Sequence, residues 1–216
     1  MGSARRSRVR VASSPTLSAH LMPECIARCR DALPGVELLL LDRIQNDVLA
    51  SVLSGEVDFG VVIDPSDRDA LHCEPILTDP FCLACPPGHR LAAKARVRWA
   101  DLAGESLVLL DHASGSRRLI DQALAAQAVP HTVAQEVGHA TTIFRMLDAG
   151  LGISVIPTLA VPPEGLPRLA VRPLVPRVDR EIVLARRRHR ELAPMAQAVW
   201  ELVGEVARQR KGLSTG

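Results

Sequence analysis

The chain has 216 residues, of which 47% are hydrophobic and 23% are charged, an ordinary globular composition that excludes disordered, collagen-like and coiled-coil classes. Its net charge of +2 is too balanced for a chain whose main task is to neutralise nucleic-acid phosphates. Aromatic residues make up only 2%, which argues against binding of single-stranded nucleic acid or carbohydrate by stacking.

The amino terminus has no pattern typical of export. Residues 1–7 include positive charge but lead directly into a strand-like segment at 9–12, without the apolar core of a signal peptide. We therefore expect a cytoplasmic protein. No window is apolar enough for a membrane span, so no membrane partner is expected. Residues 1–7 and 213–216 are expected to be disordered or vector-derived.

The first part of the chain alternates strands and helices, which is typical of a parallel sheet covered by helices. Strands are predicted at 9–13, 36–41 and 58–63, and helices at 16–33 and 46–53. Pro23 is predicted to kink or break the first helix, and Gly55 to form a left-handed cap after the second. Short apolar runs bounded by turn residues indicate strands that are buried on both faces.

A second set of elements follows an extended stretch at 71–86, which we expect to lead from one lobe into another. Strands are predicted at 106–110, 132–136 and 152–156, with helices at 116–127 and 141–149. Gly150 is predicted to be the left-handed cap of the second of these helices. Two more strands, at 169–171 and 181–185, precede a helix at 192–208, whose apolar spacing predicts packing on the first lobe.

Five cysteines are an odd number, and in a cytoplasmic chain they are expected to be reduced structural thiols. Cys25 and Cys29 share one face of a predicted helix. Cys82 and Cys85 have the spacing of a metal or redox pair, but residues three apart on a strand point to opposite faces. Redox sensing remains the alternative. The seven histidines show no metal-ligand spacing, so neither a metal nor a cofactor is expected.

Several short motifs follow one another at characteristic distances. They are ASSPTL at 12–17, LMP at 21–23, LSGEVD at 53–58, GHRLA at 88–92, WADLAG at 99–104, and GLGI at 150–153 with Pro157. In this order they resemble the effector-binding domain of LysR-type transcriptional regulators, from about residue 9 to 208. The resemblance implies an α/β fold of two Rossmann-like lobes joined by two crossover segments, as in type II periplasmic binding proteins. Lobe I is expected at 8–81 with 188–212, and lobe II at 82–187.

The resemblance also implies a function. A small anionic metabolite, such as an organic acid, is expected to bind in the cleft between the lobes and to modulate transcription. DNA is expected to be contacted only through a helix-turn-helix domain that is absent from this chain. A homodimer or higher homo-oligomer is expected, with contacts from the helices near 25–33 and 119–126.

Effector contacts are expected where strands end and helices begin, because ligands of open α/β sheets bind beyond the carboxyl ends of the strands. Free N–H groups and the positive end of the helix dipole favour an anion there. The resemblance places hydroxyl residues that hold the effector at Thr16, at the position of Gln45, which departs from the usual serine or threonine, and at Thr141. The full set of expected contacts is Ser14, Thr16, Gln45, Asp64, Ser114, His139, Thr141 and Thr142.

The serine and threonine residues of this set also have a purely structural interpretation. Serine and threonine at such positions are common helix caps. The segment at 114–118, SGSRR, has the content of an anion cradle, or else forms a turn and cap before a helix with a solvated basic edge.

Two other functions remain as alternatives. A solute-binding receptor of a transporter is disfavoured by the lack of a signal peptide. A small α/β enzyme of the same fold is disfavoured because no nucleophile motif, phosphate loop or dinucleotide fingerprint is present, and no catalytic residue is expected.

Overall fold

A computed structural model describes residues 7–211, which form two compact units. Of the described residues, unit 1 comprises 7–78 together with 181–211, and unit 2 comprises 79–180. The divisions expected from the sequence were 81/82 and 187/188, somewhat later along the chain. The expectation for the termini lies outside the described residues, except that Ser7 is the first residue of a strand.

Unit 1 contains a sheet in the order β2 (Val36–Asp42), β1 (Ser7–Ser13), β3 (Phe59–Ile63) and β10 (Asp179–Arg187). The first three strands are parallel, and β10 is antiparallel to β3. All five residues of β3 are buried, as the apolar run between two aspartates predicted. Because residues 182–185 of β10 pair with β3, this strand belongs to unit 1 from its third residue onward.

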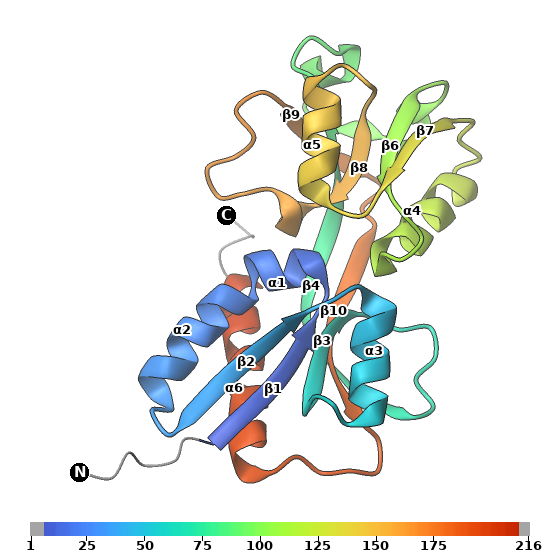
Figure 1. The fold of residues 1–216 in the computed structure, drawn as a ribbon. Helices are drawn as coiled ribbons and strands as arrows, with labels where there is room; N and C mark the ends of the chain where they lie inside the picture. Colours follow the sequence, from blue (N-terminus) through green and yellow to red (C-terminus); the bar gives the residue numbers. More distant parts are fainter. Residues whose placement is uncertain (1–6, 212–216) are drawn as a thin grey trace. The chain divides into compact units, whose positions relative to one another are not determined.

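Four helices cover the two faces of this sheet: α1 (Pro15–His20), α2 (Met22–Ala32), α3 (Gln45–Ser54) and α6 (Pro194–Lys211). In Figure 1, α2 and α6 lie on one side of the sheet and α3 lies on the other. The helix expected at 16–33 is divided at Leu21, because Pro23 opens a new helix rather than bending a continuous one. Gly55 ends α3 with a φ of 80°, which confirms the predicted left-handed cap.

Unit 2 is built around the end of β4 (Leu71–Cys85), which pairs antiparallel with both β8 (Ser154–Pro157) and β9 (Ala170–Val175). The short strand β5 (Val97–Arg98) runs parallel to β9. On the other side, β6 (Ser106–Leu110) runs parallel to β7 (Thr132–Val137), and a bridge between Leu107 and Ile153 joins β6 to the start of β8.

Two helices, α4 (Gly115–Ala126) and α5 (Ala140–Asp148), cover opposite faces of β6. Alternate residues of β6 enter two separate apolar cores, one shared with α4 and one shared with α5. Cys85 belongs to the first core and Cys82 to the second, so their side chains point to opposite faces, as the spacing predicted.

Two glycines close the α5–β8 connection. Gly150 has a φ of 79° directly after α5, which confirms its predicted conformation. Gly152 has a φ of 135°, and a Cβ atom there would lie 2.4 Å from the Ser106 carbonyl oxygen. The backbone therefore approaches β6 more closely than any side chain would allow, and β8 begins only at Ser154, two residues later than predicted.

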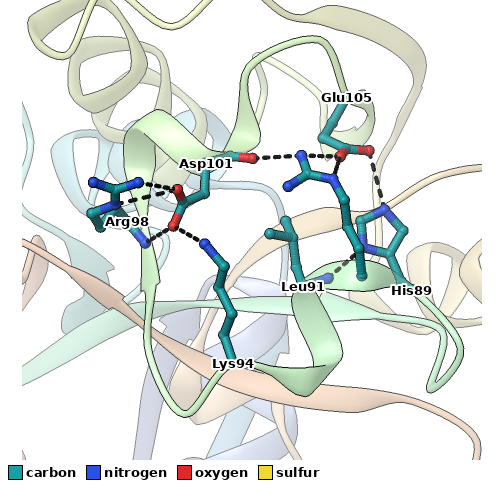
Figure 2. A network of polar contacts seen from close by, with 7 residues as sticks. His89, Leu91, Lys94, Arg98, Asp101 and Glu105 are labelled. Carbon is teal, nitrogen blue, oxygen red and sulfur yellow. Dashed lines mark hydrogen bonds and ion pairs between the residues drawn. The ribbon is translucent and has the colours of Figure 1, made fainter.

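Three 3-10 helices complete unit 2: η1 (Arg90–Ala93), η2 (Trp99–Leu102) and η3 (Thr158–Ala160). Figure 2 shows ion pairs within the η2 segment and between it and the η1 segment. Asp101 accepts a hydrogen bond from Arg98 Nη2 at 2.7 Å and pairs with Lys94 Nζ at 2.9 Å. Glu105 pairs with Arg90 Nη2 at 2.6 Å. Hydrogen bonds from Arg98 and then Lys94 lower the pKa of Asp101 below its usual range, so the carboxylate stays charged and holds this loop.

No helix within residues 7–211 combines the length and the apolar character that a membrane crossing requires.

Candidate functional site

In unit 1, polar side chains gather where β1, β2 and β3 end. Ser14 is the residue before α1, but its hydroxyl makes no capping hydrogen bond. Thr16 is the second residue of α1 and is half-buried, and its hydroxyl has no hydrogen-bond partner among the described residues. The interpretation of these two residues as side-chain caps is therefore not observed in the structure.

Gln45 is the first residue of α3 and is buried, with 8% of its surface exposed. Its side-chain oxygen accepts a hydrogen bond from the Ile63 backbone N–H at 3.0 Å, which ties the end of β3 to the start of α3. The side-chain amide nitrogen keeps two N–H donors that have no partner within residues 7–211. Gln45 thus combines a structural hydrogen bond with free donor capacity at the end of the sheet.

Charged residues at the same sheet edge are paired. Asp64 accepts hydrogen bonds from Arg68 Nε at 2.8 Å and Nη2 at 2.5 Å, so its negative charge is balanced. Arg43 forms a two-pronged pair with Glu56 at 2.7 and 2.8 Å, and the hydrogen bond from Arg43 lowers the pKa of Glu56. An anion at this edge would therefore meet neutral hydrogen-bond donors rather than an unpaired charge.

In unit 2, the amino terminus of α5 lies after β7. His139 precedes the helix and its side chain makes no capping hydrogen bond. Thr141 and Thr142 are exposed, and their hydroxyl groups have no partner in the described part of the chain. As in unit 1, hydroxyls at a helix amino terminus are available to a ligand.

The amino terminus of α4 has the cap that was one of the two interpretations of SGSRR. Ser114 is a true cap, since its hydroxyl accepts a hydrogen bond from the Ser116 N–H at 3.2 Å. Arg117 is buried and donates to the Leu110 carbonyl and to Asp121, both at 2.9 Å. Its guanidinium therefore stabilises the interior of unit 2, and an anion cradle formed by SGSRR would not include this arginine.

The arginine that does reach the start of α4 is Arg180, which no sequence pattern singled out. Arg180 is 2% exposed, donates from Nε to Asp79 Oδ2 at 2.8 Å, and donates from Nη1 to Ser116 Oγ at 3.0 Å. Asp79 also accepts from the Leu159 N–H at 2.9 Å. Burial raises the pKa of Asp79 and lowers the pKa of Arg180, since each charge is removed from water.

One atom of this cluster has no partner: Arg180 Nη2 is buried and makes no hydrogen bond within the described residues. The sequence signal for the cluster is weak. Asp79 lies in a long extended segment and Arg180 in a charge-rich stretch, and both patterns are more typical of solvated surface.

The cysteines are all free thiols, and desolvation raises the pKa of each of them. For Cys25 and Cys82 the pKa rises to about 12. With their pKa raised, these thiols are protonated near neutral pH. Because the thiolate is the reactive species, protonated thiols react slowly with oxidants. The structural interpretation of the cysteines is favoured over redox sensing.

The chain matches a known sequence family over most of its length. Residues 2–208 match the family described as the LysR substrate binding domain. The chain belongs to this family. Within this family, the LysR-type chain is 47% identical over 204 residues to the HTH-type transcriptional regulator YfeR of Shigella flexneri. The aligned region covers 94% of this chain and 66% of YfeR. It therefore spans about two thirds of the length of that relative.

Solved structures show the same fold. The regulatory domain of CcmR from Synechocystis, in complex with 2-PG, superposes with a TM-score of 0.85 at 22% identity, over 93% of this chain and 97% of that one. The effector-binding domain of QuiR in complex with shikimate gives a TM-score of 0.85 at 17% identity, over 94% and 98%. The LysR-type chain accordingly has the type II periplasmic-binding-protein-like fold that the motifs implied, and it is an effector-binding domain related to transcriptional regulators.

Proposed function

We propose that this effector-binding domain responds to a small anionic metabolite, and that hydrogen-bond donors at the carboxyl ends of the strands recognise it. The observation that supports this most directly is the set of unpartnered polar groups at these ends. They are the Thr16 hydroxyl and the Gln45 amide in unit 1, and the Thr141 and Thr142 hydroxyls in unit 2. Ser14 and His139 flank them, whereas Asp64 and Ser114 hold the surrounding backbone and side chains.

The relatives favour a regulatory role over the two alternatives. YfeR is an HTH-type transcriptional regulator rather than an enzyme or a transport receptor. The CcmR and QuiR domains have 2-PG and shikimate bound, which supports a small-molecule effector for this chain. We propose that DNA is contacted by another part of a longer protein, and that the protein works in the cytoplasm, where the chromosome lies. The ligand would act by its differential affinity for two arrangements of that protein.

The first prediction concerns the threonines. A thermal-shift screen of small organic acids should yield a ligand that, at about a hundred times its dissociation constant, adds about 2.7 kcal/mol to the free energy of unfolding. Thr16→Ala and Thr141→Ala should each weaken that ligand by about 1.5–3 kcal/mol, because a hydroxyl hydrogen bond to a charged group is lost. Isothermal titration calorimetry measures both affinities.

Ser54→Ala is the matched control, because this hydroxyl lies at the opposite end of α3 and, in the part of the chain that the structure describes, bonds only to the Ser51 carbonyl and the Glu56 N–H. It should leave ligand affinity unchanged. If the two threonine variants bind as tightly as the parent while losing stability, these residues support the helices and do not contact the effector.

We also propose that the chain forms a homodimer through α2 of one copy and α4 with β7 of the other. Among the described residues, strand β7 pairs with β6 on one side and with no strand on the other, and four of its six residues are exposed. An open edge of this kind is a common place of association. Beside it lies a largely apolar groove of about 460 Å³, which is lined by Asp121, Leu124, Ala125, Ala128, Val129, Pro130 and His131. A second copy of the chain is the simplest partner, because two-fold contacts are the commonest in soluble oligomers.

The second prediction tests this contact. Sedimentation equilibrium at micromolar concentration should give twice the mass of the chain, and Ala125→Glu should give a single-chain mass, because it buries a charge in the groove. Ala95→Glu, an exposed loop substitution in the same unit, should remain a dimer. A parent protein that is a monomer throughout this range would refute the proposed contact.

A further inference from the structure

At the first turn of α4, several hydrogen-bond donors lie together without acceptors to bind them. The helix has twelve residues, and the Gly115 N–H has no partner among the described residues. Ser116 Oγ accepts from Arg180 Nη1, which leaves the hydroxyl proton free to be donated. Arg180 Nη2 adds two buried N–H groups without a partner. Native structures pair nearly all buried polar groups, so this excess of donors requires an explanation.

The guanidinium is held so that its free edge is fixed. Asp79 Oδ2 binds Arg180 Nε, and Asp79 Oδ1 is itself fixed by the Leu159 N–H. Ser116 Oγ binds Nη1 from the first turn of α4. These contacts hold the planar fork at two of its three nitrogens and direct it to the start of the helix. The free nitrogen is thus preorganised for a partner that brings only acceptors.

The class of partner follows from the chemistry of these donors. The oxygens of a carboxylate or a phosphate accept hydrogen bonds and donate none, so they match a set of N–H and O–H donors. Arginine binds both groups through two parallel hydrogen bonds. The amino-terminal end of the α4 dipole adds further preference for negative charge. Because Asp79 already balances the charge of Arg180, affinity for the anion would come from directed hydrogen bonds more than from net charge.

We propose that unit 2 contains an oxyanion site formed by Gly115 N–H, the Ser116 hydroxyl and Arg180 Nη2, with Asp79 as the positioning residue. The site receives the carboxylate or phosphate group of the effector, and this deepens the proposed function and rests on it. Ser116 and Arg180 lie outside the set of effector contacts expected from the sequence, and Arg180 is the residue that confers selectivity for an anionic head group.

The test is an NMR titration of the whole chain, labelled with ¹⁵N, with sodium formate and separately with inorganic phosphate, at constant sodium concentration balanced by chloride. The Gly115 amide and the Arg180 Nε–H signals should shift and saturate with one or both anions. Formate reports a carboxylate site and phosphate a phosphate site. An ordered water in place of a ligand predicts no saturable shift with either anion.

Variants then locate the binding. Arg180→Lys keeps the charge but loses the fork, and we expect affinity for the better anion to fall at least tenfold. Ser116→Ala removes one donor and leaves the ion pair in place, so it is the variant that folds if Arg180→Lys does not, and it should lower affinity severalfold. Arg118→Gln on the same helix is the control, because Arg118 is exposed and, within residues 7–211, bonds only to Gln122. It should leave the affinity for the anion unchanged.

Unaltered affinity in Ser116→Ala, or the absence of any saturable shift in the parent, would overturn the site. The outcomes also separate the site from the proposed function. If an organic acid from the screen binds Arg180→Lys as tightly as it binds the parent, the oxyanion site is refuted and the effector role is not. Saturable formate or phosphate binding, without any organic acid that binds, supports the site and removes support for the effector role.

Discussion

Replacing Asp79 by alanine is expected to lower the free energy of unfolding of unit 2 by about 3–5 kcal/mol. Arg180 would keep its charge at a position that is 2% exposed, and its Nε would lose its acceptor. Urea unfolding measures the loss. Trp99 reports on unit 2, because its indole is buried there and donates to the Pro176 carbonyl at 2.9 Å, whereas Trp200 lies in unit 1.

The matched control removes both charges. The double variant Asp79→Leu with Arg180→Met should lose far less stability than Asp79→Ala, because no buried charge is left without a partner. Arg168→Ala, which breaks the exposed pair with Asp148, should change the free energy by about 0.5 kcal/mol or less. A double variant as unstable as Asp79→Ala would show that packing around these side chains, and not their charges, dominates.

Gly152→Ala is expected to destabilise unit 2 by about 2–6 kcal/mol. A φ of 135° costs a side-chain-bearing residue about 1–3 kcal/mol, and overpacking adds about 1–3 kcal/mol. The new methyl group would lie 2.4 Å from the Ser106 carbonyl oxygen, which accepts the Ile153 N–H that joins β6 to the start of β8. The same urea titration, followed at Trp99, measures the effect.

Gly150→Ala separates conformation from contact. This glycine has a φ of 79°, but the position that an alanine methyl group would take has no neighbouring atom within 4 Å. Only the left-handed conformation is therefore penalised, by about 1–2 kcal/mol. Equal losses in the two alanine variants would mean that the close approach of Gly152 to β6 relaxes at no cost.

Most of the fold was predictable because its elements are defined by local patterns. The run from Phe59 to Ile63 is apolar throughout and lies between two aspartates, so a buried parallel strand was the natural interpretation. The division of the first helix at Leu21 was less accessible, since a proline suits both a kink and a first helical turn. The late start of β8 depends on how Gly152 meets β6, which is a contact between distant segments.

The candidate site was predictable only in part, for a physical reason. Thr16, Gln45 and Thr141 follow short apolar strands, and the end of a strand is visible in the sequence. Asp79 and Arg180 are 101 residues apart and become a buried pair only when tertiary structure removes both from water. No periodicity or turn pattern distinguishes such a pair from surface charges, so the sequence did not indicate that Arg180 lies beside Ser116.

The chain passes from unit 1 to unit 2 and back, so unit 1 cannot finish folding until unit 2 has been synthesised. Unit 2 is continuous in the chain, whereas unit 1 needs β10 and α6, which are translated after unit 2. At about 5–20 residues per second, the 102 residues from 79 to 180 take roughly 5–20 s to translate. During that time β3 lacks its neighbour β10, and Phe59 lacks the Trp200 ring that packs against it at 5.3 Å. The nascent first part of unit 1 therefore presents apolar strand surface to chaperones until β10 and α6 have been synthesised.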